Sequence, residues 1–128
     1  MTLTEKLLSS DEKVANTLKT GTFKSKRLAR VLGESEPVEI QIKELAPGKI
    51  SSMSADPASS NMGTYTRICL EGIVDPDLKN PEMLKHFGCS TPLSLTEKLF
   101  SLEVANIGEA IIKLSDVGAG EEEDEIKN

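Results

Sequence analysis

The sequence predicts an α+β fold in which an N-terminal β-hairpin packs on a predominantly helical C-terminal half. Three observations predict it. The segment VEIQIKEL alternates apolar and polar residues as a half-buried strand does. Asn80-Pro81 and Thr91-Pro92 are helix start signals. Aromatic residues make up only 3% of the 128 residues, so the core must be built mainly from aliphatic side chains, which favours helices.

Two short helices are expected within residues 2–20. Thr2 or Thr4 can cap the first, and Asp11 can cap the second, which Gly21 would end. The first would carry Leu3, Leu7 and Leu8. Both are too short to be stable alone in water, so we expect them to be helical only when docked.

The β-hairpin is expected within residues 22–45. Its first strand, 23–32, would place Phe23, Ala29 and Val31 on one face and its cations on the other. The turn GESEP and the strand VEIQIKEL would complete it, and a helix must cover its apolar face, because a lone hairpin is marginally stable.

Helices are expected over residues 47–117. Pro47 suits the first turn of a helix through about Ala55, and residues 54–63 read as a loop. Thr64 can cap TYTRICLEGIV, which Asp75-Pro76-Asp77 would end. Its buried stripe would be Tyr65, Ile68, Cys69 and Ile73. The helix begun at Asn80-Pro81 would stop at Gly88.

The last helical region contains a break in its apolar pattern. Leu95, Leu99 and Leu102 form one stripe; Val104, Ile107, Ile111 and Leu114 form a second. Leu102 and Val104 are two residues apart, about 200° around a helix, so one straight helix would place the stripes on opposite faces. A bend within residues 100–103 would bring both onto one core; the alternative is a straight helix with two binding faces.

Charge and length predict one domain followed by a tail. Residues 1–118 would form a single α+β domain, and residues 119–128 a disordered acidic tail. The formal charge is −6; EEEDEIKN carries −4 of it, which leaves −2 for the rest. The N-terminus lacks the pattern of a signal peptide, and no stretch approaches a membrane span, so we expect a cytosolic protein with reduced thiols.

The residues supply no recognisable chemistry. His86 has no evident nucleophile or orienting partner, and we expect a structural or surface role. Cys69 and Cys89 lack metal-ligand spacing; Cys69 reads as core and Cys89 as partly exposed. Asp75-Pro76-Asp77 lacks the rest of a calcium loop, and there is no phosphate-binding glycine motif. We therefore expect no catalytic residue, no cofactor and no metal site.

A basic segment leaves an alternative open. Residues 19–30 hold five cations and no acid: Lys19, Lys24, Lys26, Arg27 and Arg30. They could follow a phosphate backbone, protect an edge strand from pairing, bind an acidic partner or hold the acidic tail. Without interleaved aromatics, we do not expect nucleic-acid binding to be the main function.

The segment YTRICLEGIVDPDLKNPEMLKHFG resembles one carried by XkdN-like phage tail assembly chaperones. LTEKLFSLEVANIGEAIIKL is similar to the family's leucine-rich helix, break and last helix, and FKSKRLARVLGESEPVEIQIKEL to its basic strand, turn and apolar strand. The family often breaks before the last helix with Pro-Gly, where this chain has Ser101-Leu102.

The resemblance implies a non-catalytic protein that binds the tape measure protein, and other tail proteins in some cases, and keeps it soluble during tail assembly. It implies the cytoplasm of the bacterial host and absence from the mature virion; self-association stays open. We hypothesise a helix-in-groove site on the last two helices, lined by Leu95, Leu99, Leu102, Ile107, Ile111 and Leu114; the alternative, favoured for any one of them, is that it is an ordinary core residue. The rival functions are a nucleic-acid-binding regulator and a structural tail component.

Overall fold

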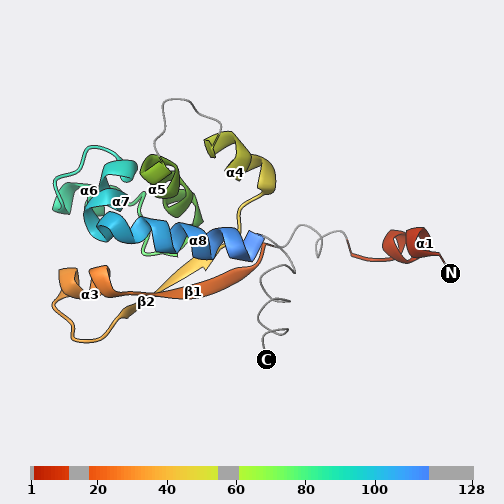
Figure 1. Ribbon diagram of the computed structural model, residues 1–128, viewed down its shortest axis with the longest axis horizontal. Helices are drawn as coiled ribbons and strands as arrows, with labels where there is room; N and C mark the ends of the chain where they lie inside the picture. Colours follow the sequence, from red (N-terminus) through yellow and green to blue (C-terminus); the bar gives the residue numbers. More distant parts are fainter. Residues whose placement is uncertain (1, 12–17, 55–60, 116–128) are drawn as a thin grey trace.

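The fold is mixed α+β, with helices stacked on one face of a three-stranded antiparallel sheet (Figure 1). The computed structural model describes residues 2–11, 18–54 and 61–115. The strands are β1 (Thr20–Ser25), β2 (Val38–Lys43) and β3 (Ile73–Asp75), in the order β1-β2-β3. Helix α8 (Val104–Ser115) lies along the sheet, as the predicted cover of its apolar face requires, and packs against α5 (Asn61–Gly72).

The N-terminal strand pair is present, but its connection is helical. Strands β1 and β2 are antiparallel with Thr20 opposite Lys43 and Ser25 opposite Val38. The predicted strand over 23–32 is wrong beyond Ser25, because α3 (Lys26–Leu32) begins there. The Ser25 hydroxyl accepts the Leu28 N–H at 3.0 Å as an N-cap, and Gly33 ends the helix at φ 73°.

In the middle of the chain, one predicted helix is confirmed and the next is wrong in part. Helix α4 (Pro47–Ser54) begins at Pro47. Helix α5 starts at Asn61 rather than after a Thr64 cap, and it ends at Gly72. The next residue, Ile73, opens β3 and pairs with Ile42, so the predicted helix is wrong over its last residues. Residues 55–60 of the predicted loop lie outside the described residues.

Close packing against α8 fixes where α5 sits. A side-chain carbon added at Gly72 would lie 2.6 Å from the Ile111 Cδ1, and one added at Gly108 would lie 2.6 Å from the Tyr65 Cδ1. Both contacts are shorter than real carbon atoms tolerate, so the two helices approach this closely because glycine faces the partner helix at each point.

The start signals of the next two helices are confirmed. Helix α6 (Pro81–His86) has Asn80 as its N-cap, accepting from the N–H of Glu82 at 2.8 Å, and Gly88 follows it with φ 67°. Helix α7 (Pro92–Phe100) has Thr91 as its N-cap, accepting from the Ser94 N–H at 3.1 Å. In both, proline occupies the first helical position.

The predicted bend is confirmed. Helix α7 ends at Phe100, a 3₁₀ turn η1 (Ser101–Glu103) follows, and α8 begins at Val104. Both apolar stripes therefore contribute to one core, which also contains β2, but Leu102 of the first stripe points away from it and is exposed. The fully buried members of this core include Ile40, Ile42, Ile68, Leu95, Leu99, Phe100, Val104, Ile107 and Ile111.

The N-terminus forms a separate short helix, α1 (Leu3–Leu8), drawn away from the rest of the chain in Figure 1. Thr2 is its cap in a full capping box with Glu5. Most of the second predicted helix lies outside the described residues, and its predicted end is wrong, because Thr20 and Gly21 belong to β1. The predicted acidic tail, 119–128, also lies outside them. Within the described ranges, the chain has no helix of the length and hydropathy that a membrane span needs.

Candidate partner-binding surface

The bend between α7 and α8 carries an exposed apolar side chain. Leu102 is 75% exposed, although the residues on both sides of the turn, Phe100 and Val104, are buried. Ser101 adopts φ 52° and ψ −134°, a conformation that costs a residue with a side chain of order 1–3 kcal/mol. The strained residue thus immediately precedes Leu102, whose side chain is held outward.

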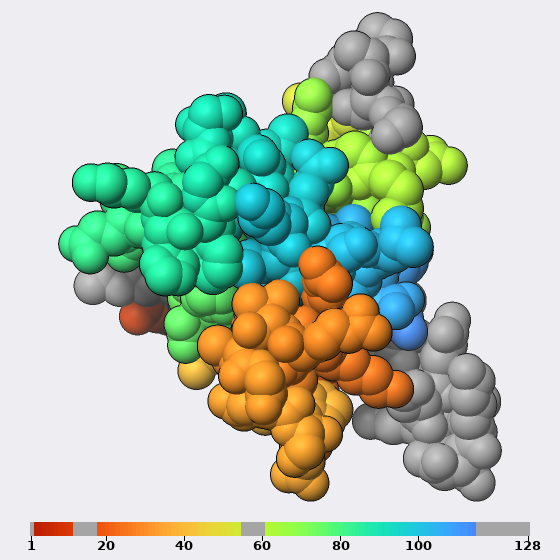
Figure 2. All heavy atoms as spheres, turned by 90° about the vertical axis from the view of Figure 1, so that its left-hand side faces the viewer, coloured from red at the N-terminus to blue at the C-terminus, as the bar shows by residue number. Residues whose placement is uncertain are grey.

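A shallow hollow of about 210 Å³ lies beside Leu102. Its lining comes from α5, α7, η1 and α8: Met62, Thr66, Glu97, Ser101, Leu102 and Val104. Met62 is 36% exposed. On the face drawn in Figure 2, the start of α5 (light green) borders the η1–α8 segment (blue). The lining combines three apolar residues with Thr66, Ser101 and the carboxylate of Glu97, a mixture that suits the apolar and polar faces of an amphipathic helix.

The six residues predicted to line a groove differ in how far the structure exposes them to solvent. Leu95, Leu99, Ile107 and Ile111 are at most 2% exposed and belong to the core. Leu114 is half-buried, and its Cδ2 would lie 3.3 Å from a side-chain carbon added at Gly21. Leu102 is the exposed member of the set. A partner can therefore reach Leu102 directly, but it reaches the four core residues only if the helices move apart.

A carboxylate from the bend holds the start of α3. Glu103 accepts hydrogen bonds from the Ser25 hydroxyl at 2.5 Å and the Lys26 N–H at 3.0 Å, and a longer one from the Arg27 N–H at 3.4 Å. The Arg27 Nη2 also donates to the Lys98 carbonyl at 3.2 Å. A negatively charged group at a helix N-terminus is favourable, so these hydrogen bonds stabilise the contact between the β1–α3 junction and the bend. The sequence contains no local signal for this pairing, because Ser25 and Glu103 are 78 residues apart.

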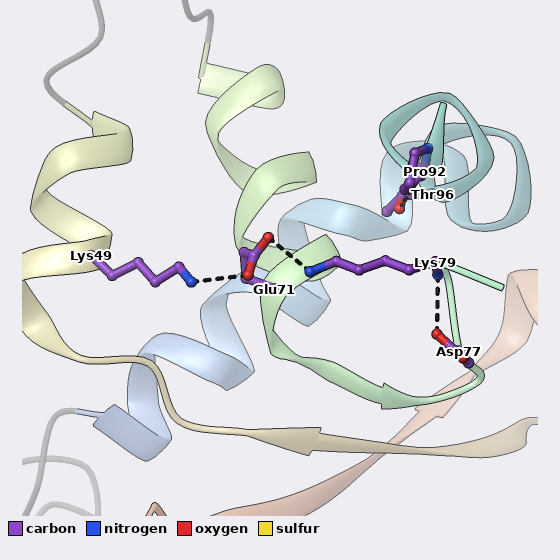
Figure 3. Close-up of polar contacts among 6 residues, drawn as sticks. All are labelled: Lys49, Glu71, Asp77, Lys79, Pro92 and Thr96. Carbon is purple, nitrogen blue, oxygen red and sulfur yellow. Dashed lines mark hydrogen bonds and ion pairs between the residues drawn. The ribbon is translucent and has the colours of Figure 1, made fainter. Parts of the chain in front are cut away.

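The turn after β3 is fastened by a second carboxylate, Glu71 at the end of α5 (Figure 3). Glu71 lies between Lys49 of α4, 2.9 Å away, and Lys79 of the turn, 3.3 Å away. The hydrogen bond from Lys49, with Lys79 assisting, lowers the pKa of the Glu71 carboxyl. Asp77 accepts the Lys79 N–H at 3.1 Å, which orders the VDPDLK turn itself. Sequence reasoning identified this turn but not the ion pairs that hold it.

The two cysteines and the histidine lie in surroundings that suit structural rather than chemical roles. Cys69 is fully buried, and burial raises the pKa of its thiol to about 12; Cys89 is half-buried, as predicted. His86 is exposed and meets the edge of the Phe87 ring, with centroids 4.8 Å apart. Among the described residues, no group of three or more His, Cys, Asp or Glu side chains is arranged to hold a metal ion.

The basic residues do not form the single strand face that the sequence predicts. Lys24 lies on β1 opposite Glu39, whereas Lys26 and Arg30 lie on α3. Lys26 and Arg30 line a hollow that also contains Glu34 and Glu36. Figure 2 shows this region (orange) below α6 and α7 (teal). Acids alternate with the cations, so this surface offers no continuous basic track for a phosphate backbone.

The comparison with family models identifies the family of this chain. A family model described as "Phage XkdN-like tail assembly chaperone protein, TAC" matches residues 4–127. A solved structure titled as the crystal structure of the protein yqbn aligns with a TM-score of 0.56 and 17% identity, over 78% of this chain and 88% of that chain. At this identity, the structural match supports the fold alone. No curated protein matches this sequence.

Proposed function

This chain belongs to the XkdN-like phage tail assembly chaperone family, and we propose that it binds the tape measure protein and keeps it soluble until the tail tube forms around it. A tape measure protein is a long, apolar, helical chain, so its isolated form exposes amphipathic helices. Helix-in-groove packing is the recognition mode that suits such a client. The proposal assigns binding, not catalysis, to this chain.

The observation that carries the proposal is the exposed Leu102 beside the hollow at the α7–α8 bend. Held out at a strained turn, this side chain contributes nothing to the core, so its exposure suits contact with a partner. Methionine is unbranched and adapts to irregular apolar surfaces, which makes Met62 a suitable neighbour for a varied client. We propose that client contact begins here.

The remaining predicted groove residues would contact the client in a second stage, after the first contact at Leu102. Leu95, Leu99, Ile107, Ile111 and Leu114 lie on the two helices that meet at the bend. Separating these helices would expose further apolar surface to a long client, at the cost of opening the core. The surface formed by Leu102 and the hollow at the α7–α8 bend is sufficient for the capture tested below.

Charge supports the solubilising part of the proposal. The chain carries a formal charge of −6, and net charge of one sign keeps a loaded complex from associating with others. We propose that it acts in the host cytoplasm and leaves before the virion is complete. Mass spectrometry of purified virions tests this: finding the chain at stoichiometric levels would identify a structural tail component instead.

Co-expression with the tape measure protein tests the function. We expect most of the tape measure protein to be soluble and to co-purify with this chain, and to become insoluble when this chain is omitted. Leu102→Asp should reduce co-purification, whereas the matched Val74→Asp, at a side chain 48% exposed on β3, should not. Equal solubility with and without this chain would refute the chaperone proposal; equal capture by folded Leu102→Asp would refute the surface alone.

A further inference from the structure

The bend after α7 has a regular alternative that would turn Leu102 inward. Leu95, Leu99 and Leu102 are spaced four and three residues apart, which places them on one face of a continuous helix. Leu95 and Leu99 are at most 2% exposed, whereas Leu102 is 75% exposed. If α7 continued through residue 102, Leu102 would turn toward the side on which the other two leucines are buried. Burial of a leucine side chain is favourable, so other contacts must maintain its outward position.

Ser101 is the residue that interrupts α7, and its backbone is strained. It ends the helix at φ 52° and ψ −134°, while its N–H still donates to the Glu97 carbonyl. Glycine adopts positive φ values readily, whereas a residue with a side chain does so at a cost in free energy. Such a conformation persists only where the surrounding structure enforces it. The contacts that hold the residues after Ser101 therefore decide where Leu102 points.

Glu103, directly after Leu102, makes such contacts with the β1–α3 junction. One carboxylate oxygen accepts from the Ser25 hydroxyl at 2.5 Å, and the other accepts from the Lys26 N–H at 3.0 Å. Ser25 is fully buried, so the Glu103 side chain is fixed against the interior while its neighbour Leu102 faces solvent. Relaxing Ser101 would rotate the backbone that carries Glu103 and break these hydrogen bonds.

Two further hydrogen bonds hold the helices on either side of the turn. The Arg27 Nη2 donates to the Lys98 carbonyl of α7 at 3.2 Å, and the Cys69 thiol donates to the Val104 carbonyl of α8 at 3.3 Å. Both reach the helices rather than the turn between them. Within the part of the chain that the structure describes, Glu103 is the side chain of the 3₁₀ turn that binds another element.

We propose that Glu103, held by Ser25, is a positioning residue for the client surface: its hydrogen bonds keep Ser101 in the strained conformation and thereby keep Leu102 outward. The role of Leu102 in client binding rests on the proposed function, whereas its positioning is a property of this chain alone. Without these hydrogen bonds, Ser101 relaxes, α7 lengthens and Leu102 turns inward. The N-terminal β1–α3 segment thus controls a surface formed by the C-terminal helices.

Methyl NMR with a soluble, uncharged paramagnetic agent measures the exposure of Leu102 in the full chain without a client. In the native protein, the relaxation enhancement of the Leu102 methyl groups should be at least that of Val74, whose side chain is 48% exposed. In Glu103→Ala, we expect the Leu102 enhancement to fall at least about threefold, because the equilibrium between the two arrangements shifts. Asn80→Ala, which removes the N-cap of α6 instead, is the matched control and should leave it unchanged.

Glu103→Gln keeps the proposal testable if Glu103→Ala does not fold. It retains one acceptor oxygen, so the Leu102 enhancement should fall less than in the alanine variant but below that of Asn80→Ala. An enhancement equal to that of the native protein in folded Glu103→Ala, or in Glu103→Gln where alanine does not fold, would overturn the proposal.

Substitution of Ser101 separates positioning from general destabilisation. Glycine adopts positive φ without the cost of a side chain, so Glu103→Ala combined with Ser101→Gly should recover most of the Leu102 enhancement. Glu103→Ala combined with Ser101→Ala keeps a Cβ, and hence the strain, and should recover none of it. Recovery with alanine as well as with glycine, or with neither, would contradict the role assigned to the strained backbone.

Capture of the tape measure protein distinguishes a failure of the positioning from a failure of the proposed function. Glu103→Ala should co-purify less tape measure protein than Asn80→Ala does, and adding Ser101→Gly should restore capture. A reduced Leu102 enhancement with undiminished capture would uphold the positioning of Leu102 but refute its use by the client. Reduced capture with an unchanged enhancement would overturn the positioning and leave the chaperone function standing.

Discussion

Removing the Glu103 carboxylate should destabilise the fold through the start of α3. In Glu103→Ala, the Ser25 hydroxyl, which is fully buried, loses its acceptor. Leaving a buried donor without its charged partner costs about 1.5–3 kcal/mol, and losing an anion at a helix N-terminus costs about 0.3–1 kcal/mol. The backbone N–H of Lys26 is exposed to water and adds little. We therefore expect a loss of about 2–4 kcal/mol in the free energy of unfolding.

Urea unfolding followed by circular dichroism measures this loss. Glu103→Gln keeps one acceptor oxygen and should lose less, about 1–2 kcal/mol, while the exposed control Glu34→Gln should stay within about 0.5 kcal/mol of the native protein. A double-mutant cycle with Ser25→Ala isolates the pair, and a coupling of about 1 kcal/mol or more is expected. If Glu103→Ala unfolds at the native midpoint with an unchanged slope, the contact contributes nothing and this reasoning is refuted.

Three further predictions follow from the core, the helix contact and the Glu71 ion pairs. Leu99→Ala should lower the free energy of unfolding by about 2–5 kcal/mol, whereas Leu102→Ala should change it by less than about 0.5 kcal/mol; similar losses would contradict the burial described here. Gly72→Ala should cost about 1–3 kcal/mol in the same measurement, because its new methyl group would overlap Ile111; a gain in stability would show that the helices separate freely. The lowered pKa of Glu71 stabilises the fold above pH 4.5, and this contribution is lost as pH falls through the folded-state pKa. The stability difference between the native protein and Glu71→Gln, less than about 1 kcal/mol at neutral pH, should therefore vanish in acid, and a difference that grows in acid would contradict it.

Local signals predicted much of the helical half. Asn80-Pro81 and Thr91-Pro92 each combine a capping side chain with a preset backbone angle, so both helix starts could be located without knowing the fold. The bend was predictable because two apolar stripes were out of phase on one helix. The stripes did not show that Phe100 would complete the core while Leu102 turned outward, since that depends on the strained Ser101.

The N-terminal half was harder to predict because its elements depend on distant contacts. Alternation through Phe23 and Ala29 resembled a strand, but Ser25 caps a helix that Glu103 stabilises from the other end of the chain. Strand β3 has three residues and forms only by pairing with β2, so its residues looked like the end of a helix. Exposure, which decides the candidate surface, is likewise a property of the assembled fold.

Protection of the tape measure protein from aggregation tests the central claim most directly. Purified tape measure protein, unfolded in denaturant, is diluted into buffer with an equimolar amount of this chain or of an inert protein of similar size and charge, and light scattering is followed. We predict that this chain suppresses scattering and remains bound to the soluble tape measure protein, and that Leu102→Asp protects less well than Val74→Asp. Scattering that rises equally with this chain and with the inert protein would contradict the account.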